Sequence, residues 1–154
     1  MKGSTLRLSY ASLAVSLVAS ALIAARPAHA ATPVVQFIRV WYDSPGKDYR
    51  GNSSLNAEYV IIKNTTRKVI DLENWVLRDE TGYKYIFGPV TLRAGKRLVV
   101  RTGQGEDTAT TVYWNRKQYV WNNDGDTATL RNATGKKIDT CGWTKLKPGY
   151  TNCS

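Results

Sequence analysis

Short apolar runs alternate with polar residues along most of the chain, and turn residues separate them. The runs are rich in Val, Ile, Tyr and Trp, and no window carries the stripe of an amphipathic helix. Runs of this length, bounded by Gly, Asn, Asp and Pro, are typical of β-strands. We expect roughly ten strands, within 34–43, 56–64, 75–80, 83–87, 90–92, 97–101, 112–114, 118–121, 127–131 and 136–141.

The alternation also assigns faces. Leu98 and Val100 would point to one side of their strand, and Arg97 and Arg101 to the other. The run 127–131 alternates in the same way. Short strands at this spacing predict an all-β sandwich or barrel.

Large aromatic side chains are spread through these strands. Trp75 and Leu77 are good candidates for the core. Core or edge packing is also the better interpretation of Trp41, Trp114 and Trp121, and a surface groove is the alternative.

The first thirty residues have a different pattern. Lys2 and Arg7 charge the start, an uncharged run follows over 8–25, and "AHA" at 28–30 fits a signal peptidase site. This order predicts a secretory signal peptide over 1–30, and therefore a secreted or cell-surface protein with no stable membrane span after cleavage. An uncleaved membrane anchor is the alternative, although serines dilute the run.

The mature chain, 31–154, is long enough for one domain with a real core. Removing the three basic residues of the signal leaves 19 basic and 12 acidic side chains, a net charge of +7. The one histidine, His29, leaves with the signal. This excludes hydrolases that use a histidine base, and zinc sites built on histidine.

Two cysteines, Cys141 and Cys153, lie near the C-terminus. In an exported chain an even number predicts a disulfide, which would close a short C-terminal extension over 143–154. A redox-active pair is the alternative, but the spacing matches no redox motif. The loop-entropy model gives the disulfide roughly 2–3 kcal/mol of stabilisation.

The stretch "NNDGD" at 122–126 places Asp124 and Asp126 on either side of a glycine. Asp–Gly is a strong hairpin signal, so we interpret the stretch as a turn between two strands with both acids in water. A surface Ca²⁺ site on Asn122, Asp124 and Asp126 is the alternative. An EF-hand is excluded because the next acid after Asp126 is Asp139.

No active site can be assembled from the remaining acids. A glycosidase needs two carboxyl groups that face each other across a cleft, whereas the pairs at 79–80 and 106–107 are expected in solvated turns. The glycines of "TGQGED" lack the lysine and the following helix of a phosphate-binding loop. We therefore predict no catalytic residues and no cofactor.

The positive charge suggests an anionic partner, such as DNA or an anionic wall polymer. The residues that would matter most, if they converge, are Lys63, Arg67, Lys68, Arg93, Lys96, Arg97 and Arg101. A generic soluble surface is the alternative, because acids are interspersed with these cations.

Four stretches in order carry a family resemblance: "NAEYV", "LENWVLRDETGYKYIF", "LRAGKRLVVRTGQGEDT" and "WNNDGDTATLRNATGKKID". Together they cover about 34–142 and resemble the lamin-tail domain, in particular its exported bacterial versions. The resemblance implies an immunoglobulin-like β-sandwich over 31–142, without catalytic residues. In nuclear lamins this domain contacts proteins and chromatin, and in bacteria it accompanies secreted enzymes as an accessory module.

These observations predict a secreted, non-enzymatic β-sandwich that binds a protein or cell-envelope component at or outside the cell surface. Polyanion binding is the second hypothesis. The third is an enzyme with an unusual site, assisted by a metal at the Asp124 turn.

Overall fold

Eleven strands and one short helix make up residues 31–145 and 148–153, the part of the chain that this computed structural model describes. The expected signal peptide over 1–30 lies outside the described residues. Within them, no helix is both long and apolar enough to cross a membrane.

Five strands form one sheet, in the order β11-β1-β2-β7-β8. The β7–β8 pair is parallel and the other pairs are antiparallel. The strand bounds are β1 Val35–Trp41, β2 Tyr59–Asn64, β7 Arg97–Arg101, β8 Thr111–Tyr113 and β11 Tyr150–Asn152.

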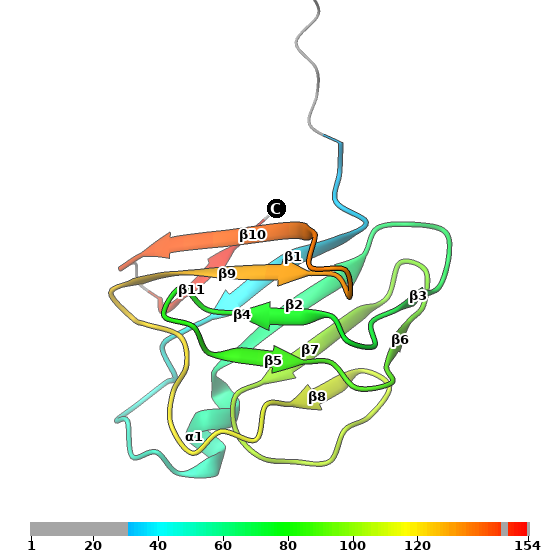
Figure 1. Ribbon diagram of the computed structural model, residues 1–154. Helices are drawn as coiled ribbons and strands as arrows, with labels where there is room; N and C mark the ends of the chain where they lie inside the picture. The colour runs from blue at the N-terminus through cyan, green and yellow to red at the C-terminus, as the bar shows by residue number, and fades with distance from the viewer. Residues whose placement is uncertain (1–30, 146–147, 154) are drawn as a thin grey trace, which may run out of the picture. The chain divides into compact units, whose positions relative to one another are not determined.

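A four-stranded antiparallel sheet, in the order β10-β9-β4-β5, stacks on the first, and a two-stranded sheet of β3 and β6 lies at one end (Figure 1). This arrangement is the immunoglobulin-like β-sandwich that the family resemblance implies. The bounds are β3 Ile70–Asp71, β4 Val76–Arg78, β5 Lys84–Ile86, β6 Thr91–Leu92, β9 Gly125–Arg131 and β10 Lys137–Thr144.

The core lies between the two large sheets, where alternate side chains point inward. Leu98 and Val100 are buried on one sheet, and Ala128 and Leu130 on the other, as the alternation predicts. A series of rings, each in contact with the next, crosses the interior. Its members are Tyr42, Trp143, Trp121, Trp114, Tyr85 and Phe87.

Several features differ from the expected elements, and one is the two-residue strand β3, which no expected run includes. The helix α1, Asn52–Ala57, has six residues and buries only Leu55, so it leaves no periodic stripe in the sequence. The expected strand at 118–121 is wrong, because the backbone N–H groups of Val120 and Trp121 bond to the Glu58 carboxylate instead of a neighbouring strand.

The last difference lies at the C-terminus. The expected domain boundary at residue 142 falls inside β10, and β11 pairs with β1 from within the expected extension. A disulfide joins Cys141 to Cys153, as predicted. Because Cys153 N–H also bonds to the Ile38 carbonyl oxygen (3.1 Å), this bridge links the edges of the two large sheets.

Candidate functional site

Asn64, at the end of β2, is fully buried and joins the loop after β2 to the end of β6 and the loop that follows it. Its Nδ2 donates to the carbonyl oxygens of Lys68 (2.7 Å) and Leu92 (2.8 Å). Its Oδ1 accepts from the backbone N–H (2.9 Å) and hydroxyl (2.8 Å) of Thr66. Its own N–H donates to the Lys96 carbonyl oxygen (3.0 Å). Asn64 therefore fixes the backbone of the segments that carry several cationic residues.

Six of the seven predicted polyanion-binding residues lie around this asparagine. Lys63 and Arg97 are opposite each other on β2 and β7, and Lys96 N–H bonds to the Arg93 carbonyl oxygen (3.0 Å). We call this set the basic end of the sandwich: Lys63, Arg67, Lys68, Arg93, Lys96 and Arg97. Lys63 is half-buried and the other five are exposed.

Arg101 is the predicted residue that does not join them. It lies four residues along β7 from Arg97, about 13 Å away at the usual rise of a strand. Its guanidinium lies over the Tyr59 ring, 5.5 Å from the centroid, and donates to the Asn56 carbonyl oxygen.

The cations of the basic end are not neutralised by ion pairs. Over the described residues, the one ion pair within 4.0 Å joins Lys145 to Asp124. An acid is present at this end, since Asp71 lies opposite Thr91 in the two-stranded sheet, but its carboxylate accepts from the Glu73 N–H (2.9 Å). None of the six cations of the basic end is therefore in an ion pair with a carboxylate of the described residues.

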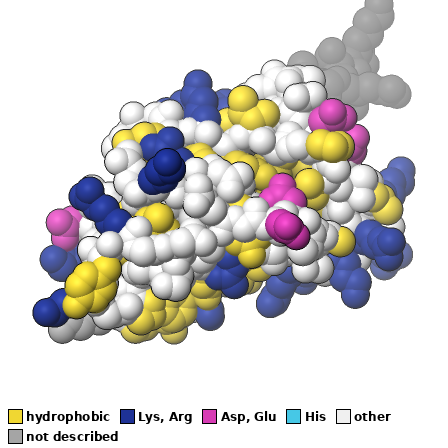
Figure 2. Space-filling view, turned by 90° about the horizontal axis from the view of Figure 1, so that it is seen from below, with side chains coloured by type: hydrophobic (Ala, Val, Ile, Leu, Met, Phe, Trp, Pro, Cys, Tyr) yellow, Lys and Arg dark blue, Asp and Glu magenta, His cyan; other side chains and the backbone are white. Residues whose placement is uncertain are grey.

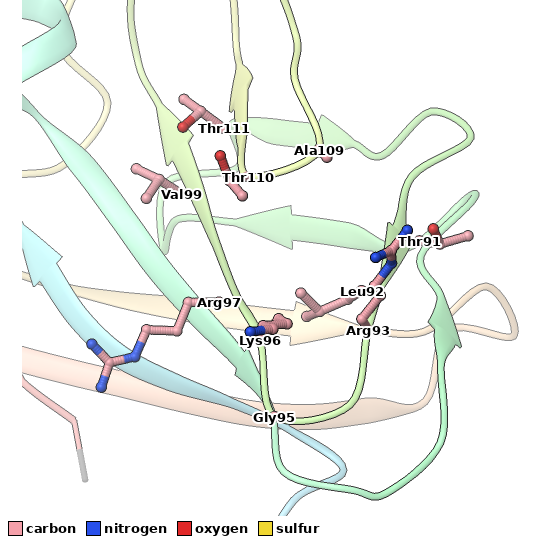
Figure 3. A pocket seen from close by; sticks show the side chains of 10 residues that line it. All are labelled: Thr91, Leu92, Arg93, Gly95, Lys96, Arg97, Val99, Ala109, Thr110 and Thr111. Atoms are coloured by element: carbon pink, nitrogen blue, oxygen red, sulfur yellow. The ribbon is translucent and has the colours of Figure 1, made fainter.

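A groove of about 770 Å³ runs beside these cations (Figure 3). Arg93 extends from the end of β6 back along that strand, beside Thr91, whereas Arg97 points away on the other side of β7. Hydroxyl, aliphatic and cationic groups line the groove: Thr91, Leu92, Arg93, Gly95, Lys96, Arg97, Val99, Ala109, Thr110 and Thr111. Such a lining suits an anionic group that carries a short apolar part.

Positive charge is not confined to this end. Figure 2 views the molecule from the side of α1 and β8 and shows Lys and Arg side chains in several places, more of them than Asp and Glu. The basic end is distinguished by its fixed loops and its groove.

The stretch at 122–126 forms a turn. Asn122 Oδ1 accepts from the Asp124 N–H (3.0 Å), and the Asn122 carbonyl oxygen accepts from Gly125 N–H (3.3 Å). The expected hairpin is wrong, because no strand precedes the turn. Asp124 is exposed and bonds to Lys145 (2.9 Å).

Asp126 corrects the expectation that both acids point into water. It is buried, and its carboxylate accepts from the backbone N–H groups of Glu80 (2.9 Å), Asn122 (3.2 Å) and Thr127 (2.7 Å). Asp79, also expected in a solvated turn, is buried as well. Its Oδ1 accepts from the backbone N–H groups of Gly82 (2.7 Å) and Tyr83 (2.6 Å).

Backbone N–H groups therefore satisfy part of the acceptor capacity of the Asp126 carboxylate. Within 31–145 and 148–153, no three His, Cys, Asp or Glu side chains are grouped so as to hold a metal ion.

Glu58 is a buried acid that the sequence reasoning missed. Its Oε1 accepts from the Thr102 hydroxyl (2.6 Å) and from the N–H groups of Val120 (2.9 Å) and Trp121 (3.4 Å), while Oε2 has no partner. Desolvation by burial raises the pKa of the carboxyl to about 7. The three hydrogen bonds act in the opposite direction and lower the pKa, and the negative charge of Asp48 adds a smaller increase. The sequence feature that could have predicted this buried acid is its position within the apolar run at 56–64.

Comparison with known families gives a match. The model of the family described as Lamin Tail Domain matches residues 28–145, most of the chain. This span includes all four stretches on which the resemblance was based. A search of curated proteins found no match.

Proposed function

The chain belongs to the lamin tail domain family, and from that premise we propose that it is a binding module for an anionic polymer. The family is an immunoglobulin-like, non-catalytic one, so an interaction role is the coarse function that membership supports. The finer proposal is that the ligand is a polyanion such as DNA or an anionic wall polymer, bound at or outside the cell surface.

The observation that carries this proposal is the basic end. Six cations gather around Asn64, on backbone that its hydrogen bonds hold in place. No carboxylate of the described chain lies within 4.0 Å of their charged groups. Cations on fixed loops bind an anion at a lower cost in conformational entropy than cations on mobile ones.

The location outside the cell rests on two supports. The first thirty residues have the order of a secretory signal. The Cys141–Cys153 disulfide is of the kind that persists in oxidising compartments.

Affinity as a function of salt concentration tests the proposal. For duplex DNA, each phosphate neutralised contributes about −0.9 to the slope of log K against log salt. Engagement of most of the basic end therefore predicts a slope of roughly −4 to −5. Arg93→Gln and Lys96→Gln, assayed separately, should each weaken binding and reduce the steepness by about one.

Lys84→Gln is the matched control, because Lys84 is an exposed cation on β5 of the other sheet. It should leave affinity and slope close to those of the wild type. Affinity that does not change with salt, or equal losses from all three variants, would show that the basic end is not a binding site.

A further inference from the structure

The outer face of the five-stranded sheet carries a continuous row of aromatic and cationic side chains. The strand register places Trp41 opposite both Tyr150 and Tyr59, Tyr59 opposite Arg101, and Arg101 opposite Tyr113. Each of the five strands contributes one member. The alternation of the strands puts these residues on the side away from the core, where they are half-buried.

The rings of Trp41, Tyr59 and Tyr150 cover one another's faces, and Gly105 lies against the ring of Tyr113. The Trp41 ring stacks on Tyr150 at 4.8 Å and on Tyr59 at 5.9 Å, with interplanar angles of 26° and 28°. Because β11 and β2 lie on opposite sides of β1, the two tyrosines cover both faces of the tryptophan. The Arg101 guanidinium covers Tyr59 from the next strand, and that of Arg39 lies 4.5 Å from the Tyr150 centroid. The row therefore offers ring edges to a ligand.

The two guanidiniums are held in place and remain uncompensated. Arg39 Nε donates to Asn152 Oδ1 (2.9 Å), and Arg101 donates to the Asn56 carbonyl oxygen. These bonds and the ring contacts leave other N–H groups of each guanidinium available. Neither has a carboxylate within 4.0 Å in the described chain. Arginines fixed in this way lose little freedom when they bind an anion.

The same face is continuous with the basic end. Arg97, Val99 and Arg101 alternate along β7 on the outer side, and Lys63 lies opposite Arg97. Cations therefore extend from Lys63 and Arg97, past Arg39, to Arg101, over a length of about 13 Å along the strands.

We propose that a flexible polyol-phosphate chain, a phosphodiester polymer without bases, lies across this outer face from the basic end to Arg39 and Arg101. The inference rests on the proposed function and names its ligand. Repeated single negative charges match the repeated cations. Single-stranded nucleic acid binds such surfaces by stacking its bases on free ring faces, and here the faces are covered. A rigid duplex would touch a sheet along one line, whereas a narrow chain can follow it.

Poly(glycerol phosphate) of defined length is the probe, compared with single-stranded and duplex DNA of equal charge. Arg39→Gln and Arg101→Gln should each reduce its affinity about 3–10-fold and reduce the steepness of the salt dependence by about one. The basic-end variant Arg93→Gln should have a similar effect. At equal charge, poly(glycerol phosphate) should bind at least as tightly as either DNA.

The other sheet offers matched controls. Arg131 on β9 and Arg78 on β4 are also half-buried, and each donates to a backbone carbonyl oxygen, of Gly135 and Asp79 respectively. Arg78→Gln and Arg131→Gln should leave the affinity and its salt dependence unchanged. The melting temperature of every variant separates a loss of binding from a loss of folding.

The possible results divide the two proposals. If Arg93→Gln weakens binding and Arg39→Gln and Arg101→Gln do not, the polymer does not bind across the outer face. The proposal that the basic end binds a polyanion would still hold. If single-stranded DNA binds more tightly than poly(glycerol phosphate), its bases stack on the protein. If duplex DNA binds more tightly, the surface prefers a rigid polymer. Either result overturns the inference. If no polyanion binds at any salt concentration, the proposed function fails as well.

Discussion

Glu58 carries a carboxyl group in the interior of the sandwich, where water cannot stabilise its charge. Burial raises the pKa of this group from 4.5 to about 7. Its hydrogen bonds tie the loop at Val120 and Trp121 to Thr102 at the end of β7. One titrating group thus couples the protonation state to the anchoring of a long loop.

This raised pKa predicts a direction for stability against pH. Between pH 4.5 and about 7 the folded chain keeps a proton on Glu58 that the unfolded chain has lost. The contribution of Glu58 to the free energy of unfolding should therefore be greatest below pH 4.5, fall as the pH rises, and level off above about 7. The total change is on the order of 3 kcal/mol.

Urea denaturation of the wild type and Glu58→Gln between pH 4 and 8 measures this change. Glutamine has nearly the same shape and stays neutral, so the difference in unfolding free energy between the two proteins should vary over the predicted range. A difference that is constant with pH would show that Glu58 does not titrate in this way.

The burial of two acids, Asp126 and Asp79, could have been predicted by extending the alternation of inward and outward side chains by two residues in each strand. Asp126 continues the inward series of Ala128 and Leu130, and Asp79 continues that of Trp75 and Leu77. Sequence reasoning assigned both to water because Asp is common in solvated turns. What it could not supply was the set of backbone N–H groups from distant segments, such as Glu80 N–H on Asp126, that offsets the cost of burial.

At the scale of elements, the strands of the large sheets were the most predictable part. The expected strand at 97–101 has the same bounds as β7, and its two faces are as expected. The segment 118–121 has an equally apolar pattern but bonds to a side chain. The basic end could be named residue by residue, whereas its convergence depends on Asn64, whose contacts reach 28 positions along the chain to Leu92.

The pair of β2 and β7 carries a second prediction. Lys63 and Arg97 are directly opposite on the outer face, and like charges in such a pair destabilise a sheet by up to about 1 kcal/mol. Lys63→Gln should therefore raise the free energy of unfolding by a few tenths of a kcal/mol or more, while it weakens polyanion binding. Urea denaturation and a binding titration on the same samples measure the two effects.

Arg97→Gln and the double variant complete this cycle. The second substitution should add little stability after the first, because the repulsion has already been removed. If the two substitutions change the free energy of unfolding additively, the two cations do not repel each other appreciably. If Lys63→Gln lowers stability, the packing of the lysine's aliphatic stem stabilises the fold by more than the repulsion of its charge destabilises it.

At the scale of the whole molecule, the charge balance connects stability to binding. The chain after residue 30 has a net charge of +7, and its described part has one ion pair within 4.0 Å. Repulsion among uncompensated cations weakens with salt, since the screening length falls from about 30 Å at 0.01 M to about 8 Å at 0.15 M. Salt should therefore stabilise the free protein while it weakens the complex with a polyanion.

The melting temperature of the free protein should rise by a few degrees across this range, because a change of about 1 kcal/mol shifts a domain of this size by several degrees. In a variant with Arg67→Gln, Lys68→Gln and Lys96→Gln, both the rise and the polyanion affinity should shrink, since the same charges cause both. A melting temperature that falls with salt would mean that attractive pairs dominate the surface. The basic end would then not be the uncompensated patch on which the binding proposal depends.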